Sequence, residues 1–455
     1  MPKQNSMGVE SNRASVLERW FHLTENGTSV RTEMLAGVTT FLTMAYIIFV
    51  QPAVLSACGM DFGAVLVATC LSSALATLLM AFLANYPIAV APAMGHNFFF
   101  AYSVVIGMKV PWQVALGGVA IAGIIFILTA GFGLRERLIT AIPESLKHAI
   151  AVGIGLLIAT IGLQWAGVIV ASPGTLVTLG NLKTPPVLLA LFGLVVMAML
   201  FVLNVRGAVL WGILAATAAG LVFGLVRYQG LISRPPSLVP TLLQLDILGA
   251  FKPEMVEVIF VFFFLALFDT VGTLVGVAQQ AGLMRDGTLP RARQALLTDA
   301  IGTVGGAALG TSTVTAYIES ATGVAAGGRT GLANIVTASL FLLSLLFFPL
   351  VKMIGGGYQV AEGHMLYPVI APALILVGTM MMKGVRLIPW DDMTEAIPAF
   401  LTMIMMPLAV SITEGIAFGF ISFALLKLVT GRGREVHWFI YLFAVLFLIR
   451  YIVLV

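Results

Sequence analysis

Two acidic side chains fall inside long apolar stretches of this chain. Asp269 directly follows Phe262-Phe-Phe-Leu-Ala-Leu-Phe, and Glu319 falls in Thr315-Ala-Tyr-Ile-Glu-Ser. A carboxylate near the middle of a membrane costs about 2.5–3.5 kcal/mol on insertion scales, so it needs a function or a buried partner. It can accept N–H donors and can also bind and release a proton. Both residues are therefore candidates for binding a polar solute and exchanging protons, with a structural hydrogen-bonded role as the alternative.

Polar neighbours of Asp269 extend this candidate site. Thr270 and Thr273 lie one position and about one helical turn away, and the spacing predicts a polar patch that lines a cavity. Asp299 lies with Thr303 on the following apolar stretch, where we expect it to support the site rather than contact the solute.

A second group of polar residues lies in Gly95-His-Asn-Phe-Phe-Phe-Ala-Tyr. The side chain of Asn97 can donate and accept hydrogen bonds, so it is a candidate for binding a solute, and capping a helix is its alternative role. His96 either faces the same cavity or packs. Glu257 and Glu414 lie near the ends of predicted spans, where solvated side chains are expected.

The elements that carry these residues are predicted to be membrane-spanning helices. The chain is 60% hydrophobic and only 10% charged, and apolar stretches of roughly 20 residues recur along it, each long enough to cross a bilayer. About fourteen spans are predicted, with a last apolar stretch at 438–455 that either spans or lies at the interface. They begin near Glu33, Asp61, Pro87, Trp112, Leu146, Pro186, Ala208, Glu254, Arg291, Thr311, Thr330, Gly363, Ala396 and Thr413.

The distribution of Lys and Arg predicts how the spans are oriented. With the amino terminus inside, 17 of the 24 basic residues fall in inner connections and 6 in outer ones, Arg450 being set aside. Because cytoplasmic connections normally carry the excess, a cytoplasmic amino terminus is favoured.

Two interrupted segments suggest that the chain contains two related halves. Residues 87–95 carry two prolines, and residues 310–317 are β-branched and follow a glycine, so each predicts a short extended strand leading into a half-helix. Such paired interruptions mark the solute site in transporters built from inverted repeats, although close helix packing also uses glycine. We expect a tail (1–32), a seven-span repeat (33–226), an outer connection (227–253), a second repeat (254–430) and a carboxyl-terminal segment (431–455).

Several functions are disfavoured by what the sequence contains. Cys58 and Cys70 form no metal or redox spacing with the scattered histidines, so neither metal nor cofactor is expected. No nucleophile cluster indicates an enzyme, and nucleic-acid binding is not expected of so apolar a chain. The polar first thirty residues do not resemble a cleaved signal peptide.

Several segments resemble the AzgA-like branch of the nucleobase–cation symporters, the hypoxanthine, guanine and adenine permeases. They are AGVTTFLTMAYIIFVQP, APAMGHNFFFAY, LFDTVGTLVG, DAIGTVGGAALGTSTVTAYIESATGVAAGGRTGL and SITEGIAFGFISF. The resemblance covers about residues 31–431, and its longest run, 299–332, is highly specific. Family members usually have a small or aliphatic residue where this chain has His96.

The resemblance implies an all-α, uracil-permease-like fold of fourteen spans in two inverted repeats, with core and gate domains. It implies a purine nucleobase as substrate, guanine or hypoxanthine being favoured over adenine, protons as the coupling ion, the bacterial cytoplasmic (inner) membrane as location, and often a homodimer. Asn97, Asp269 and Glu319 match the family's purine-binding and proton-coupling positions. We expect Asp269 chiefly to bind the substrate and Glu319 chiefly to couple protons.

An anion exchanger or channel of the same fold class is the alternative function. Such a protein should present cationic side chains to its cavity, whereas the sequence puts Asp269 and Glu319 there and no Lys or Arg at comparable depth. A neutral solute carried with a cation therefore fits better.

Overall fold

The computed structural model describes residues 16–132, 142–284, 289–361 and 364–453. Its α-helices are α1 (Val16–Phe21), α2 (Val30–Met44), α3 (Ile47–Ser56), α4 (Phe62–Leu79), α5 (Met94–Phe98), α6 (Trp112–Phe132), α8 (Glu144–Trp165), α9 (Pro185–Val202), α10 (Ala208–Val222), α11 (Pro253–Gln280), α12 (Ala292–Leu309), α13 (Ser320–Ala325), α14 (Leu332–Ser344), α15 (Phe348–Gly355), α16 (Ala371–Met381), α17 (Met393–Ala409), α18 (Ile412–Val429) and α19 (Trp438–Val453).

Shorter elements complete the chain. Two π-helical segments, η1 (Met80–Ala84) and η2 (Phe99–Gly107), continue α4 and α5. The 3₁₀ segments are η3 (Gly249–Phe251), η4 (Leu345–Phe347), η5 (Met382–Leu387) and η6 (Gly433–Glu435). The strands are β1 (Val90–Pro92), β2 (Ile169–Ser172), β3 (Leu176–Leu179), β4 (Val314–Ala316), β5 (Tyr358–Ala361) and β6 (His364–Leu366).

The predicted all-α membrane architecture is confirmed. Within the described residues, 8 helices are long and apolar enough to cross a membrane, and α10, α17 and α19 are shorter apolar helices. Together with α12, α16 and the two interrupted segments, these helices follow the predicted order of spans, with α19 as the additional apolar stretch at the end. The protein is thus a multi-pass membrane protein in which each interrupted segment lies between long helices along the chain.

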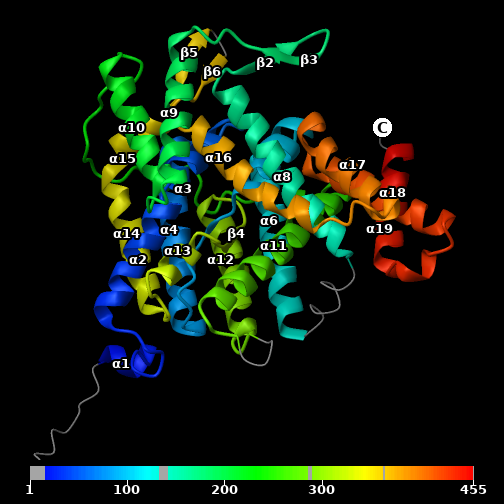
Figure 1. The fold of residues 1–455 in the computed structure, drawn as a ribbon, viewed down its shortest axis with the longest axis horizontal. Helices are drawn as coiled ribbons and strands as arrows, with labels where there is room; N and C mark the ends of the chain where they lie inside the picture. The colour runs from blue at the N-terminus through cyan, green and yellow to red at the C-terminus, as the bar shows by residue number, and fades with distance from the viewer. Residues whose placement is uncertain (1–15, 133–141, 285–288, 362–363, 454–455) are drawn as a thin grey trace, which may run out of the picture.

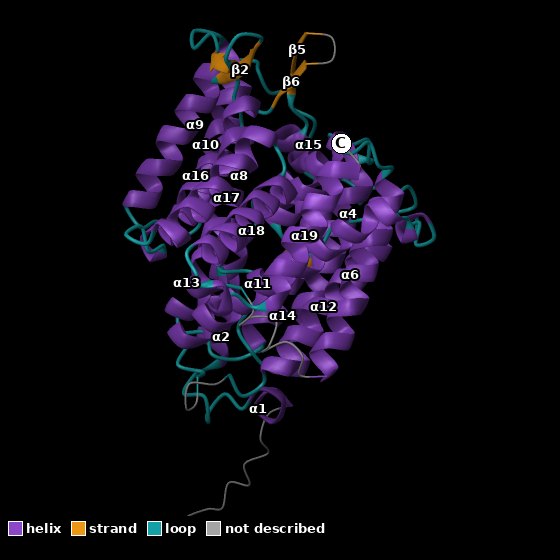
Figure 2. Cartoon of the chain, turned by 90° about the vertical axis from the view of Figure 1, so that its right-hand side faces the viewer, coloured by secondary structure: helices purple, strands orange, loops and turns teal. Residues whose placement is uncertain are grey.

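Two antiparallel hairpins, β2–β3 and β5–β6, interrupt the predicted helical pattern. They project at one end of the molecule, here called the hairpin side, and α1 lies at the other, the α1 side (Figures 1 and 2). The second hairpin displaces the twelfth span: it was expected near Gly363, which lies outside the described residues, but α16 begins only at Ala371. Apolar connections of this kind can be mistaken for the start of a span.

Close contact between helices far apart in sequence explains how the spans pack. A Cβ on Gly37 of α2 would lie 2.3 Å from the carbonyl oxygen of Ala333 in α14, so only glycine permits this approach. The buried carboxylate of Glu33 accepts hydrogen bonds from the backbone N–H groups of Arg329 (2.8 Å), Thr330 and Ala333. It thereby satisfies donors that the start of α14 leaves without a helical partner.

The two interrupted segments meet as an antiparallel pair of strands. In β1 and β4, Val90 pairs with Ala316, Ala91 with Thr315, and Pro92 with Val314. All six residues are buried. The predicted extended stretches before both half-helices are therefore confirmed, and they lie side by side.

One threonine in each half holds its strand in the same way. Thr77 of α4 donates to the carbonyl of Val90 and accepts from its N–H, both at 3.0 Å. Thr303 of α12 donates to the carbonyl of Val314 at 2.9 Å and accepts from its N–H at 3.2 Å. The matching contacts relate α4–β1 to α12–β4, as expected for two repeats related by inversion.

Candidate functional site

Asp269 lies on α11 beside the strand pair and is open to solvent. Its Oδ2 accepts a hydrogen bond from the hydroxyl of Thr315 in β4 at 3.0 Å. The side chain is exposed although it follows a run of buried residues from Val261 to Leu267. Asp269 therefore presents a carboxylate to an open space inside the apolar domain.

Glu319 lies at the start of the second half-helix, where it occupies the N-cap position of α13. Its Oε1 accepts from the hydroxyl of Tyr46 at 2.7 Å, and Tyr46 lies at the break between α2 and α3. The side chain is half-buried, and the preceding Ile318 is 50% exposed. Glu319 is thus bound to a residue of the first repeat, and Asp269 is bound to Thr315, four residues before Glu319.

The expected polar patch of Thr270 and Thr273 beside Asp269 is corrected by the structure. Thr270 is fully buried and donates to Oδ2 of Asp299 at 2.7 Å, and Thr273 is also buried. Because each residue turns a helix by about 100°, a neighbour of Asp269 faces a different side. Asp299 also accepts from the N–H of Ala316 at 2.8 Å. Asp299 therefore binds β4, the strand that carries the Thr315 hydroxyl, and its supporting role stays a prediction.

Asn97 lies in the first half-helix and is sealed from solvent. It is 0% exposed, and its Oδ1 accepts a hydrogen bond from the hydroxyl of Ser312 just before β4. Among the described residues its Nδ2 has no hydrogen-bond partner. The Asn97 amide therefore connects α5 to the segment before β4 through its oxygen, while its Nδ2 donor is not used in the described part of the chain.

His96 is buried beside Asn97, with 3% of its surface exposed. Its Nε2 has no hydrogen-bond partner within the described part of the chain. Burial in apolar surroundings favours the neutral form of an imidazole. Of the two open alternatives, the structure has His96 packed rather than facing a cavity.

Aromatic side chains cover the far end of the first half-helix. Phe98 stacks on Tyr102 with ring centroids 5.8 Å apart, and the Tyr102 hydroxyl accepts from the indole N–H of Trp165 at 2.9 Å. Trp165, at the end of α8, packs in turn on Tyr367. These rings join the first half-helix to α8 on the side away from β1.

One face of α11 is exposed from Asp269 onward. Gly272, Gly276 and Gln279 follow Asp269 at helical spacing and are all exposed. A Cβ on Gly272 would meet no atom within 4 Å, and one on Gly276 would meet only Ile318, at 3.8 Å. This face runs to the end of α11 at Gln280, from which the chain turns into α12.

The turn after α11 lies on the α1 side of the molecule. The N–H of Arg291, just before α12, donates to the hydroxyl of Tyr86 at 3.0 Å, and the adjacent Asn85 donates to the carbonyl of Phe21 in α1 at 3.1 Å. The exposed face of α11 that begins at Asp269 therefore runs toward the α1 side.

Three contacts at the site were not predicted. Tyr46 and Thr315 occur in the segments TMAYIIF and TSTVTAYIES, but only the fold brings their hydroxyls to Glu319 and Asp269. The Nζ of Lys147 lies over the ring of Phe268, 5.6 Å from its centroid, and pairs with Glu144 at 2.7 Å. In the sequence, such residues can be recognised only as hydroxyl or amine side chains within an apolar span.

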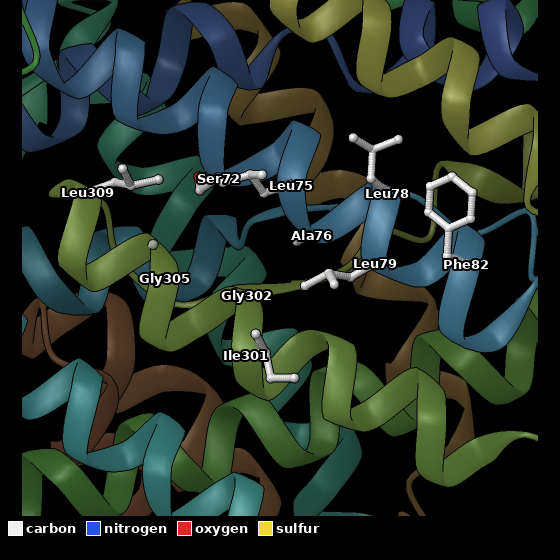
Figure 3. Close-up of a pocket in the computed structure, with 11 residues that line it drawn as sticks. Ser72, Leu75, Ala76, Leu78, Leu79, Phe82, Ile301, Gly302, Gly305 and Leu309 are labelled. Carbon is white, nitrogen blue, oxygen red and sulfur yellow. The ribbon is translucent and has the colours of Figure 1, made fainter.

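A separate groove of about 270 Å³ lies between α4 and α12 (Figure 3). Its lining is almost wholly apolar, with Leu75, Leu79 and Ile301 around Ser72 and the glycines of α12. Figure 3 shows these aliphatic side chains without a charged group among them. This groove suits an apolar chain and is distinct from the carboxylate site.

Two partly exposed carboxylates beside a buried strand pair, inside a bundle of membrane-spanning helices, define the class of membrane transporters with interrupted helices. Residues 31–418 match the Permease family (Xan_ur_permease), and the chain belongs to this family. It is accordingly a transporter and not an enzyme.

Relatives and a solved structure agree with this assignment. The chain is 48% identical to the guanine/hypoxanthine permease PbuG of Bacillus subtilis, over 96% of this chain and 100% of that protein. It is 45% identical to the adenine permease AdeP of Escherichia coli, over 97% of each. The transmembrane domain of the cyanobacterial bicarbonate transporter BicA superposes with a TM-score of 0.63 at 16% identity, covering 85% of this chain and 97% of that domain. The last comparison establishes the fold alone.

Proposed function

We propose that this protein imports a purine nucleobase together with protons. The observation that carries the proposal is the pair of carboxylates at the strand junction, Asp269 bound to Thr315 and Glu319 bound to Tyr46. Similarity to permeases named for adenine and for guanine/hypoxanthine supports a purine as the solute.

Guanine and hypoxanthine fit an ionised carboxylate better than adenine does. Both carry an N–H at ring position 1, and guanine adds an exocyclic amine beside it, so they can donate to a carboxylate. Adenine has an acceptor at that ring position, which a carboxylate repels unless it is protonated. With Asp269 as the principal binding group, the order guanine or hypoxanthine before adenine follows.

The two carboxylates have different surroundings, which suggests different roles. Asp269 lies within the continuous helix α11, and its hydrogen bond from Thr315 leaves carboxylate lone pairs for a solute. Glu319 begins a half-helix and bonds to Tyr46 on another span, so a change in its protonation alters a contact between spans. We assign substrate binding chiefly to Asp269 and proton coupling chiefly to Glu319, with Asn97 and Asp299 holding the strands in position.

The proposal includes an orientation and a domain division. We place the protein in a bacterial cytoplasmic membrane with the α1 side facing the cytoplasm, as the Lys and Arg distribution favours. In this orientation the exposed face of α11 that begins at Asp269 runs toward the cytoplasm. Spans 1–4 and 8–11 would form a core domain and the others a gate domain, with the two repeats at 33–226 and 254–430; a homodimer is proposed from the family resemblance.

An anion exchanger is the second candidate, and one contact favours it. Lys147 reaches Phe268, the residue before Asp269, so a cation does approach the cavity. Its Nζ is paired with Glu144 at 2.7 Å, however, whereas the carboxylate of Asp269 is exposed. The balance of charge therefore favours a neutral solute with a proton over an anion.

Uptake by purified protein in liposomes distinguishes these functions. Radiolabelled guanine, hypoxanthine and adenine are offered with and without an inward proton gradient, alongside uracil and bicarbonate. We expect accumulation of purine above the outside concentration only with the gradient. Gradient-independent exchange of bicarbonate with no purine uptake would overturn the proposal in favour of an anion carrier.

A further inference from the structure

A three-residue ion cluster lies far from the carboxylate site. Arg450 of α19 bonds through its Nε to Glu257 of α11 at 3.0 Å and through a terminal nitrogen to Glu414 of α18 at 2.9 Å. The adjacent Tyr451 donates its hydroxyl to the other oxygen of Glu414. These side chains are only 21–22% exposed in the two pairs, so the glutamates are not the solvated residues that the sequence suggested.

Helix α19 also bridges α11 and α18 through aromatic contacts. Phe443 stacks on Phe260 of α11, with centroids 3.7 Å apart and planes at 20°. Phe447 meets Phe420 of α18 edge-on, at 6.4 Å. Helix α19 therefore connects α11 and α18 through both ion pairs and aromatic contacts.

The cluster borders a pocket of about 380 Å³ at the end of the third span. Arg450 and Glu414 form one wall, and Tyr102, Ser103 and Met108 belong to the opposite one. The hydroxyl of Ser103 donates to the carbonyl of Val410, between α17 and α18, at 3.3 Å. The pocket thus lies where η2 meets the α17–α18 turn.

This pocket is on the opposite side of the protein from α1. The third span starts at Tyr86 on the α1 side, passes through β1 and ends at Gly107, beside the pocket. The Arg450 cluster therefore joins α11 to α18 on the side of the protein that lies away from α1.

We propose that Arg450 is a positioning residue of the transport cycle, which holds α11 against α18 and so keeps the pocket beside it from widening. This inference rests on the proposed function, because it requires a transporter that opens alternately to the two sides of the membrane. Of the two ion pairs, the one to Glu257 joins α19 to the helix that carries Asp269. Opening the pocket separates η2 and α11 from α18, so it must break that pair or the one to Glu414.

The test measures how readily the pocket opens, without any purine. In a Cys58→Ser, Cys70→Ala background, a Ser103→Cys substitution provides one thiol in the pocket wall. Right-side-out vesicles are treated with a membrane-impermeant maleimide, and the labelling rate is compared with and without Arg450→Gln. Arg432→Gln is the matched control, because Arg432 also pairs with two carboxylates, Asp392 and Glu435, neither of which is on α11.

We expect Arg450→Gln and Glu257→Gln each to raise the labelling rate by roughly fivefold, since each removes a partly shielded ion pair. Arg432→Gln and the charge-conserving Arg450→Lys should stay within about twofold of the parent. Equal rates for Arg450→Gln and Arg432→Gln overturn the proposal, as does a raised rate for Arg450→Gln without one for Glu257→Gln. If Arg450→Gln does not insert, Glu257→Gln and Arg450→Lys decide the question, and failure of purine uptake affects neither result.

Discussion

The two half-helix regions are built alike but differ in their access to solvent. In the first repeat, Asn97 and His96 are buried at 0% and 3% exposure, and the amide of Asn97 is bound to Ser312. In the second, Asp269 is exposed and Glu319 half-buried. The two regions thus share the same arrangement of a strand and a half-helix, but in this structure the first, the sealed region, is buried and the second, the open region, is exposed. The difference indicates that solute chemistry is concentrated on the second repeat, while the first holds the strands together.

The largest expected effect comes from Asp269→Asn, which changes the open region. The substitution keeps the size and the Thr315 contact but removes the charge that accepts purine N–H groups. Hydrogen bonds to a charged group contribute about 1.5–3 kcal/mol, so affinity should fall by roughly 10- to 100-fold. Calorimetry with guanine on purified protein measures it. Unchanged affinity in a folded variant would show that the open carboxylate is not the binding group.

Glu319→Gln should separate binding from accumulation. Glutamine retains an oxygen that can accept from Tyr46 but cannot exchange a proton. We expect purine counterflow to persist, with affinity within about threefold of the parent, while accumulation driven by a proton gradient disappears. Paired counterflow and gradient-driven uptake measurements in the same liposomes provide the check. A variant that still concentrates purine under an inward proton gradient would remove Glu319 from the coupling role.

The sequence allowed much of this comparison to be predicted, but not which region is open. Proline at 87 and 92 and the β-branched run at 311–315 disfavour regular helix, so the two extended stretches could be located in advance. Burial of Asn97 could not, because it depends on Ser312, 215 residues away. The same holds for Thr270, whose apolar neighbours gave no indication that its hydroxyl would face Asp299 rather than the cavity.

Local sequence patterns also could not predict ion pairs between residues that are far apart in the sequence. Glu257 and Glu414 were expected near span ends and Arg450 within the last apolar stretch, and only the packing of α19 brings the three together. A count of basic residues in connections could not reveal that Lys147 extends over Phe268. Long side chains place their charge several ångströms from the backbone position that the sequence predicts.

Asn97→Ala tests whether the sealed region acts on the solute or on the scaffold. The truncation leaves the Ser312 hydroxyl without its acceptor and should weaken purine binding by about 0.5–1.5 kcal/mol, or roughly two- to tenfold. Ser312→Ala is the matched variant, because it breaks the same hydrogen bond from the other side. If Asn97 acts through the scaffold, both variants lower affinity and melting temperature alike. A loss of affinity confined to Asn97→Ala would instead favour direct contact between the amide and the base.

The smallest effect is expected for His96→Leu, a change inside the sealed region. Leucine has a similar volume, and at this position the resembled family usually carries a small or aliphatic residue. The buried Nε2 of His96 has no hydrogen-bond partner among the described residues, so removing the ring strands no other group. We therefore expect the competition ranking of guanine, hypoxanthine and adenine to stay the same and the melting temperature to be unchanged or slightly higher. A changed ranking, measured by competition against labelled guanine uptake, would mean that the first half-helix opens to the solute elsewhere in the cycle. His96 would then be a specificity residue, and the contrast between the two regions would describe one state of the protein rather than a division of labour.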